Sequence, residues 1–132
     1  MMDRKYELIA FTKDITDAEN ARIFMTEDLE WTLREPFHDL VYKCQRKEKE
    51  KNSIIDLTLA QEYVSAYEKC ARFEFLVGDD KYGVIFLSKA CEYAAPHDEL
   101  ADDFIRLRNE TIATARKYGY TDLLRDQQWP FL

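Results

Sequence analysis

The stretch that decides the fold is GDDKYGVIFLSKACEYAAP, residues 78–96. Its apolar block, VIFL, could form a buried strand after a glycine-containing loop, where enzymes often bind phosphate. The loop lacks the G-x-G-x-x-G spacing and the Lys-Ser pair of a phosphate-binding loop. Gly78 is instead placed to end one helix in the left-handed conformation, and Asp79 or Asp80 to cap a second over 81–94, apolar nearly all round. We therefore predict a helical hairpin.

The N-terminal half shows helical periodicity with one ambiguous segment. Residues 3–13 fit both a strand alternation and one helical face, and we favour a helix because no partner strand is evident. A capping box at 16–19 predicts a helix to about Arg34. Because proline disrupts a preceding turn, Pro36 is expected to start a new helix, which ends in the charged run 43–52.

The C-terminal half continues the pattern. Ser53 is expected to cap a long helix that ends at Val77. A further helix, 98–118, begins in acids and ends in bases, an order that complements the helix dipole. Gly119 closes it, and a short helix over 121–127 follows. The sum is an all-α fold, a small bundle of five or six helices.

The composition indicates one domain over residues 1–132, long enough to bury a core. Three glycines and three prolines are too few for a many-turned β-sandwich. The net charge of −7 repels nucleic acid and anionic lipid, so we expect neither nucleic-acid nor membrane partners. Three cysteines without a C-x-x-C pair lie on apolar stripes, as reduced, buried thiols do. We found no signal peptide or membrane span, and expect a cytoplasmic protein.

Residues 64–97 span the two helices of the hairpin, and the first of these helices carries a pattern of aromatic, thiol and small side chains. They resemble a single tetratricopeptide repeat, a helix-turn-helix unit of about 34 residues. Tyr67 stands where that family has Trp, Cys70 where it has Leu, and Ala71 where it has Gly. Glu74 departs from the family pattern, which has Tyr at that position.

The second helix of the hairpin continues this resemblance through Gly83, Leu87 and Ala90, although Pro96 falls one residue late. The small residues would let the two helices approach closely. A repeat array needs about three stacked copies. A shift by one repeat length puts Lys117 opposite Gly83, so the pattern occurs once. The resemblance implies a helical pair and, by analogy, a protein-binding scaffold.

A second resemblance lies in LRNETIA, residues 107–113. The segment is similar to the R-N-x-x-x-H motif of small all-α HEPN domains, many of which act on RNA or partner nucleotidyltransferases. Arg108 and Asn109 match the motif, but Ala113 stands where the histidine belongs. This resemblance implies an alternative function, that of a degenerate, inactive HEPN-like domain with a cleft at Arg108 and Asn109.

Groups for catalysis or metal binding are sparse. His38 and His97 lack metal-ligand spacing, and the cysteines lie on apolar stripes that raise thiol pKa. We expect no metal and no cofactor. Whether the protein is an enzyme stays open, and we favour a non-catalytic role. The basic run within 43–51 fits the cation-rich end of a helix better than a nucleic-acid surface, because no aromatic residues interleave with it.

The leading functional hypothesis is a non-catalytic protein–protein interaction or oligomerisation domain. It would bind a protein partner, or itself, through aromatic side chains and an acidic face. The C-terminal WPFL segment could dock on its own chain or on another. The candidate contact residues are Trp31, Tyr63, Tyr67, Tyr82, Trp129, Phe131 and Leu132.

Overall fold

The computed structural model describes residues 27–52 and 54–132, with side chains from residue 32 onward. The predictions for residues 3–13 and for the capping box at 16–19 lie outside the described residues, as does Ser53 itself. No helix within the described part is long and apolar enough to cross a membrane.

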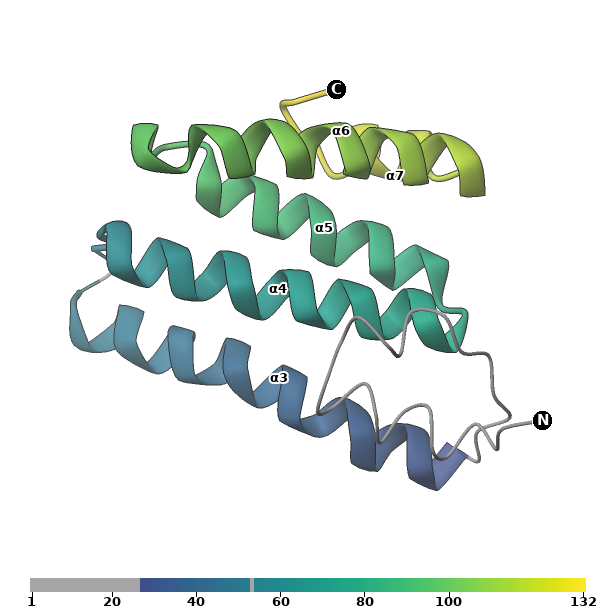
Figure 1. Ribbon diagram of the computed structural model, residues 1–132, viewed down its shortest axis with the longest axis horizontal. Coiled ribbons are helices and arrows are strands. Elements are labelled where there is room, and N and C mark those ends of the chain that lie inside the picture. The colour runs from purple at the N-terminus through teal and green to yellow at the C-terminus, as the bar shows by residue number, and fades with distance from the viewer. Residues whose placement is uncertain (1–26, 53) are drawn as a thin grey trace.

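The described residues form five α-helices and one short 3₁₀ helix, without a strand, so the all-α prediction is confirmed. Helices α3 to α6 lie side by side in chain order, and α7 lies along α6 (Figure 1). Each of these four helices therefore packs mainly on its neighbours in sequence. The elements are α3 (Glu27–Glu50), α4 (Leu57–Val77), α5 (Asp80–Ala94), η1 (Asp98–Leu100), α6 (Ala101–Tyr118) and α7 (Thr121–Asp126).

The predicted helix break at Pro36 is wrong, because α3 runs through it from Glu27 to Glu50. A proline inside a helix costs about 3 kcal/mol, since it removes one backbone hydrogen bond and crowds the preceding turn. Side chains on both sides of Pro36 offset this cost. Leu33 and Phe37 are buried in the core that α3 shares with α4, and the Phe37 ring packs 5.4 Å from that of Phe73.

The start of α4 also differs from the prediction, because residues 54–56 are not helical and Asp56 rather than Ser53 caps the helix, whereas the predicted ends at Gly78 and Gly119 are confirmed. Helix α4 begins at Leu57 with Asp56 as its cap, whose Oδ1 accepts a hydrogen bond from the Leu59 N–H at 2.9 Å. Gly78 ends α4 with φ of 89°, in the left-handed region. Asp79 then caps α5, and Gly119 ends α6 with φ of 81°. These caps fix the turns that align α4, α5 and α6.

The two helices of the hairpin, α4 and α5, approach closely at Gly83. A methyl group on Gly83 would lie 2.6 Å from Cε1 of Phe75, well inside van der Waals contact. Ala71 and Ala90 are completely buried in the same core. Small residues at these positions therefore set the separation of the two helices, as the sequence predicted.

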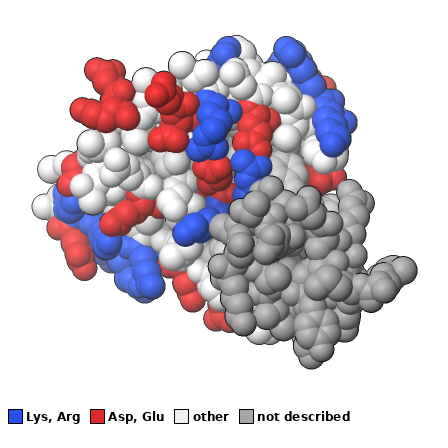
Figure 2. All heavy atoms as spheres, in the orientation of Figure 1, with Lys and Arg blue, Asp and Glu red and all other residues white. Residues whose placement is uncertain are grey.

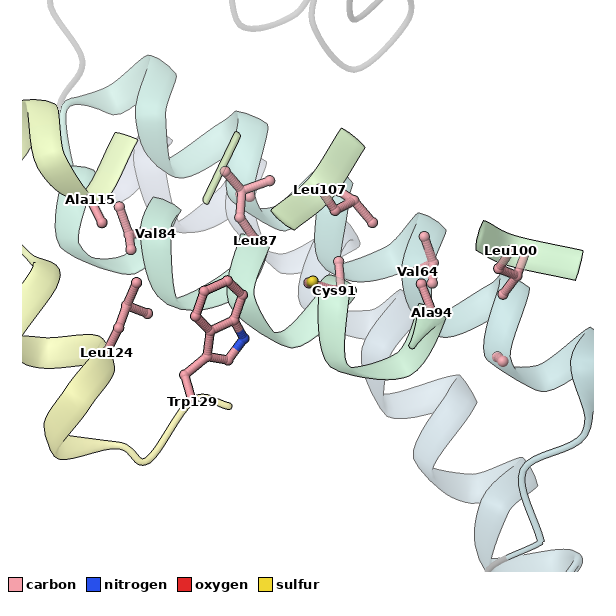
Figure 3. Close-up of a cluster of buried hydrophobic side chains, with 13 residues drawn as sticks. Val64, Val84, Leu87, Cys91, Ala94, Leu100, Leu107, Ala115, Leu124 and Trp129 are labelled. Atoms are coloured by element: carbon pink, nitrogen blue, oxygen red, sulfur yellow. The ribbon is translucent and has the colours of Figure 1, made fainter. Parts of the chain in front are cut away.

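The C-terminal segment docks on its own chain. Trp129 is buried beside Leu87, Cys91 and Leu124 (Figure 3). Its Nε1 donates a hydrogen bond to the Ser88 carbonyl at 3.2 Å. The segment thus packs on α5, so docking in cis is the alternative that the structure shows.

Replacing Gly83 with alanine should lower the free energy of unfolding by about 1–3 kcal/mol, because the methyl group displaces the Phe75 ring. This loss should exceed the gain of about 1 kcal/mol from the helix propensity of alanine. Urea denaturation measures the difference. In a Phe75→Leu background the same substitution should cost much less. An equal cost in both backgrounds would show that the contact with Phe75 is not the cause.

Candidate partner-binding site

A buried carboxylate joins α3 to the end of α4. Glu74 is 2% exposed, and its two oxygens accept hydrogen bonds from Arg34, at 2.7 Å from Nε and 2.8 Å from Nη2. Burial alone would raise the pKa of Glu74. The polar contacts of Glu74 with His38 and Arg34, together with the positive charge of Arg34, outweigh burial and hold this pKa below its ordinary value. Glu74 is therefore ionised at neutral pH.

His38 lies next to this pair and lacks a matching partner. Its Nε2 is 3.9 Å from Oε2 of Glu74, beyond hydrogen-bond distance. This nitrogen is inaccessible to solvent and finds no hydrogen-bond partner among the described residues. The imidazole ring packs nearly perpendicular to the ring of Phe86 on α5, with centroids 5.8 Å apart. An unsatisfied buried polar atom is rare in native proteins and marks this point as unusual.

Two neighbouring hollows meet at Arg34 and His38, and together we call them the α3–α5 cleft. The larger, of about 390 Å³, lies between α3, the end of α4 and the start of α5. The cleft thus combines a buried ion pair with aromatic walls and an acidic rim. Its described lining residues are Thr32, Arg34, Glu35, His38, Asp39, Tyr42, Glu74, Asp79, Tyr82 and Phe86.

A continuous series of aromatic rings extends from the cleft along α4 and α5. Tyr82 packs against Phe86, and Phe86 against Tyr67, each with centroids 6.0 Å apart. Tyr67 stacks on Tyr93, and Tyr93 stacks on Tyr63 with a separation of 4.0 Å. The series becomes more buried away from the cleft. Burial raises the pKa of Tyr67 to about 12, so its hydroxyl stays protonated.

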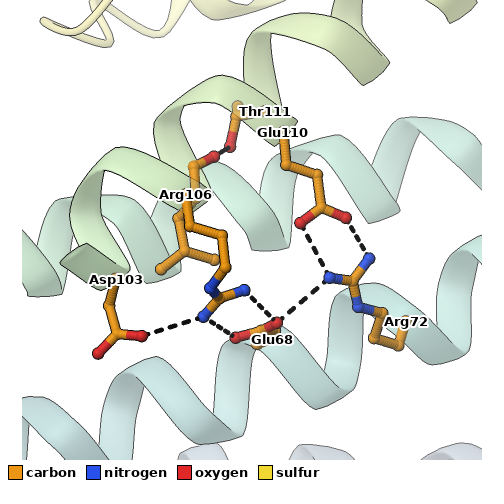
Figure 4. Close-up of polar contacts among 7 residues, drawn as sticks. Glu68, Arg72, Asp103, Arg106, Glu110 and Thr111 are labelled. Atoms are coloured by element: carbon orange, nitrogen blue, oxygen red, sulfur yellow. Dashed lines mark hydrogen bonds and ion pairs between the residues drawn. The ribbon is translucent and has the colours of Figure 1, made fainter. Parts of the chain in front are cut away.

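A second charged cluster pins α4 to α6. The Arg106 guanidinium binds both oxygens of Glu68, at 2.7 and 2.9 Å, and also contacts Asp103 (Figure 4). Arg72 bridges Glu68 and Glu110. Burial would raise the pKa of Glu68, but these two arginines outweigh it and lower that pKa. Because its charges satisfy one another, we interpret the cluster as structural.

One face of the molecule carries charges of both signs (Figure 2). Basic and acidic side chains are interspersed over the face shown in Figure 2. Two lysines of the predicted basic run also form ion pairs with acidic side chains, Lys47 with Glu62 and Lys51 with Asp56. These pairs tie the end of α3 to the start of α4.

The predicted contact residues divide by burial, and two of them are removed from the surface. Tyr63 is 1% exposed, with its hydroxyl donating to Glu48 at 2.6 Å, and Trp129 is 5% exposed. Both were expected to contact a partner, but their rings are packed in the hydrophobic core. Tyr67 and Phe131 are partly buried, whereas Tyr82 and Leu132 are exposed. The side chain of Trp31 lies outside the described part.

The two residues of the alternative cleft have different surroundings. The Nε of Arg108 donates a hydrogen bond to the Phe131 carbonyl at 2.8 Å, so this side chain holds the C-terminal segment. Asn109 is exposed on α6.

The three cysteines, Cys44, Cys70 and Cys91, are buried and unpaired. Burial raises the pKa of Cys70 and of Cys91 to about 12, which leaves almost no thiolate at neutral pH. The described residues also contain no group of three His, Cys, Asp or Glu side chains placed to bind a metal ion.

Sequence reasoning missed Arg34, His38 and Glu74 as parts of a site. One signal was present, since Glu74 puts a charge on the apolar stripe that carries Cys70 and Phe73. A charge on a core-facing position needs a partner, and that partner is 40 residues away in the sequence. Only the packing of α3 on α4 identifies Arg34 as the partner of Glu74.

Comparison with family models, curated proteins and solved structures gave no match. The interpretation of the α3–α5 cleft therefore rests on its own geometry.

Replacing Glu74 with glutamine should lower the free energy of unfolding at pH 7 by about 3 kcal/mol, because it removes the buried negative charge that accepts two hydrogen bonds from Arg34. The folded pKa of Glu74 is lowered, so its stabilisation is complete above the unfolded pKa of about 4.3 and disappears as the pH falls through the folded value. Urea titrations of wild type and variant should converge at low pH. A constant difference from pH 7 to about pH 3 would contradict the ion pair. The surface variant Glu99→Gln is the control.

Proposed function

We propose that this chain is a non-catalytic protein-interaction domain that binds its partner at the α3–α5 cleft. One observation carries the proposal. Large aromatic side chains from two helices stay exposed around one cleft, with Tyr42 at 53% and Tyr82 at 48% exposed and Phe86 partly buried between α3 and α5. Exposed aromatic residues bordered by polar groups are typical of protein interfaces, where they supply much of the binding energy.

The rigidity of the cleft supports the same role. Its floor is the bidentate pair of Arg34 and Glu74, and its wall continues into the stacked tyrosines of the core. A surface that is already ordered loses little conformational entropy when a partner binds. The tetratricopeptide-like pattern of residues 64–97 favours a binding scaffold by analogy of fold alone. Buried thiols suit a reducing compartment, and we propose the cytoplasm.

The alternative, a degenerate HEPN-like domain acting on RNA, stays a prediction. No observation favours it, because the Arg108 side chain holds Phe131 of the C-terminal segment.

Tyr82→Ser should weaken partner binding at least about tenfold, the effect of losing one aromatic contact residue. The matched control is Ile105→Ser, because Ile105 on α6 is similarly exposed, at 56%. Each variant and the wild type serve as bait in a quantitative pull-down, and light scattering over a range of concentrations measures self-association.

The expected result is a partner, or a second copy of the chain, whose binding falls for Tyr82→Ser and is unchanged for Ile105→Ser. Two results would contradict the proposal: a strictly monomeric chain with no partner, or equal losses in both variants. Circular dichroism verifies that each variant is folded.

A further inference from the structure

We propose that the α3–α5 cleft takes an arginine side chain from a basic segment of the partner. This inference rests on the proposed interaction function and specifies the partner's chemistry. Three features of the cleft argue for it: the sign of its charge, its aromatic walls and the unsatisfied nitrogen of His38.

The charge of the cleft selects a cation. The described lining residues carry four carboxylates against one guanidinium. Because Arg34 already neutralises Glu74, the charges that remain belong to Glu35, Asp39 and Asp79. No cation among the described residues forms an ion pair with these three. The net charge of −7 on the whole chain reinforces the attraction.

The aromatic walls favour guanidinium over ammonium. The rings of Tyr82 and Phe86 lie 6.0 Å apart with their planes at 36° and form one side of the larger hollow. A guanidinium is planar and weakly hydrated, so it stacks on such rings while its N–H groups bind carboxylates. A lysine ammonium is a compact, strongly hydrated charge and loses more solvation in the same place.

His38 supplies an acceptor for the same cation. Its Nε2 forms no hydrogen bond with the described residues, and the side chain, which lines both hollows, is 31% exposed. In the neutral tautomer with the proton on Nδ1, Nε2 accepts a hydrogen bond. A guanidinium N–H donated from the cleft would satisfy this nitrogen, which has no hydrogen-bond partner among the residues that the structure describes. The oxygens of Glu74 are already bound by Arg34.

The test uses the full ¹⁵N-labelled chain and the blocked peptide Gly-Arg-Gly, followed by NMR. The control peptide replaces arginine with citrulline, which has almost the same shape but no charge. We expect saturable shifts of the Asp79 and Tyr82 amides, with a dissociation constant of about 1 mM or tighter. The citrulline peptide should bind at least about tenfold more weakly, because it lacks the charge-assisted hydrogen bonds. A lysine peptide should lie between the two.

Two variants connect the binding to the cleft. Asp79→Asn removes a charge but keeps a residue that caps helices well, so α5 should still begin at the same place. It should weaken arginine-peptide binding about fivefold to tenfold. Asp126→Asn removes an exposed charge on α7, outside the cleft, and should have no effect.

The inference is overturned if the arginine peptide causes no saturable shifts at millimolar concentration, if the citrulline peptide binds equally well, or if both aspartate variants weaken binding alike. Such a result leaves the proposed function standing when Tyr82→Ser still abolishes partner binding, since the partner would then be recognised by other chemistry. If the arginine peptide does not bind and Tyr82→Ser does not weaken partner binding, the proposed interaction function at this cleft is contradicted as well.

Discussion

The close packing of α4 against its neighbours is the constraint on which the rest of the structure depends. This helix is buried towards both α3 and α5, and the absence of a side chain at Gly83 makes room for the Phe75 ring against α5. Once α4 is buried from two sides, the charges that it carries must be neutralised locally. Glu74 finds Arg34 on α3, and Glu68 finds Arg106 on α6. The ion pairs therefore connect α3 and α6 to the hairpin, in addition to the hydrophobic packing between these helices.

The two charged clusters have different surroundings. Glu68 and Arg106 are partly exposed, and pairs of this kind contribute about 1 kcal/mol or less each. Glu74 is almost fully buried, and a buried ion pair is seldom more stabilising than an apolar pair of the same volume. A buried carboxylate at the floor of an open cleft is therefore better explained by what it does for the cleft. It fixes Arg34, and that places negative charge and aromatic rings in one rigid arrangement.

Local sequence signals were enough to predict most of the helix ends. Gly78, Asp79 and Gly119 act through the backbone conformations and hydrogen bonds of their immediate neighbours, and these are visible in the sequence. Pro36 misled the prediction because its local cost is offset by Phe37 packing on Phe73, a contact between distant residues. The site was missed for the same reason. Tyr63 and Trp129 looked like surface aromatics, and their burial depends on which helix faces cover them.

The central claim, that the α4–α5 hairpin is the structural core around which α3 and the C-terminal segment assemble, is tested most directly by native-state hydrogen exchange. Core elements exchange only through global unfolding, whereas peripheral ones open locally at lower free energy. Backbone amides of buried residues in α4 and α5, such as Ala71 and Ala90, should have the highest protection. Their free energies of opening for exchange should equal the free energy of global unfolding. Those of α3 and α7 should exchange through smaller openings. Equal protection in α3 and α5, or early exchange from α4, would contradict this hierarchy.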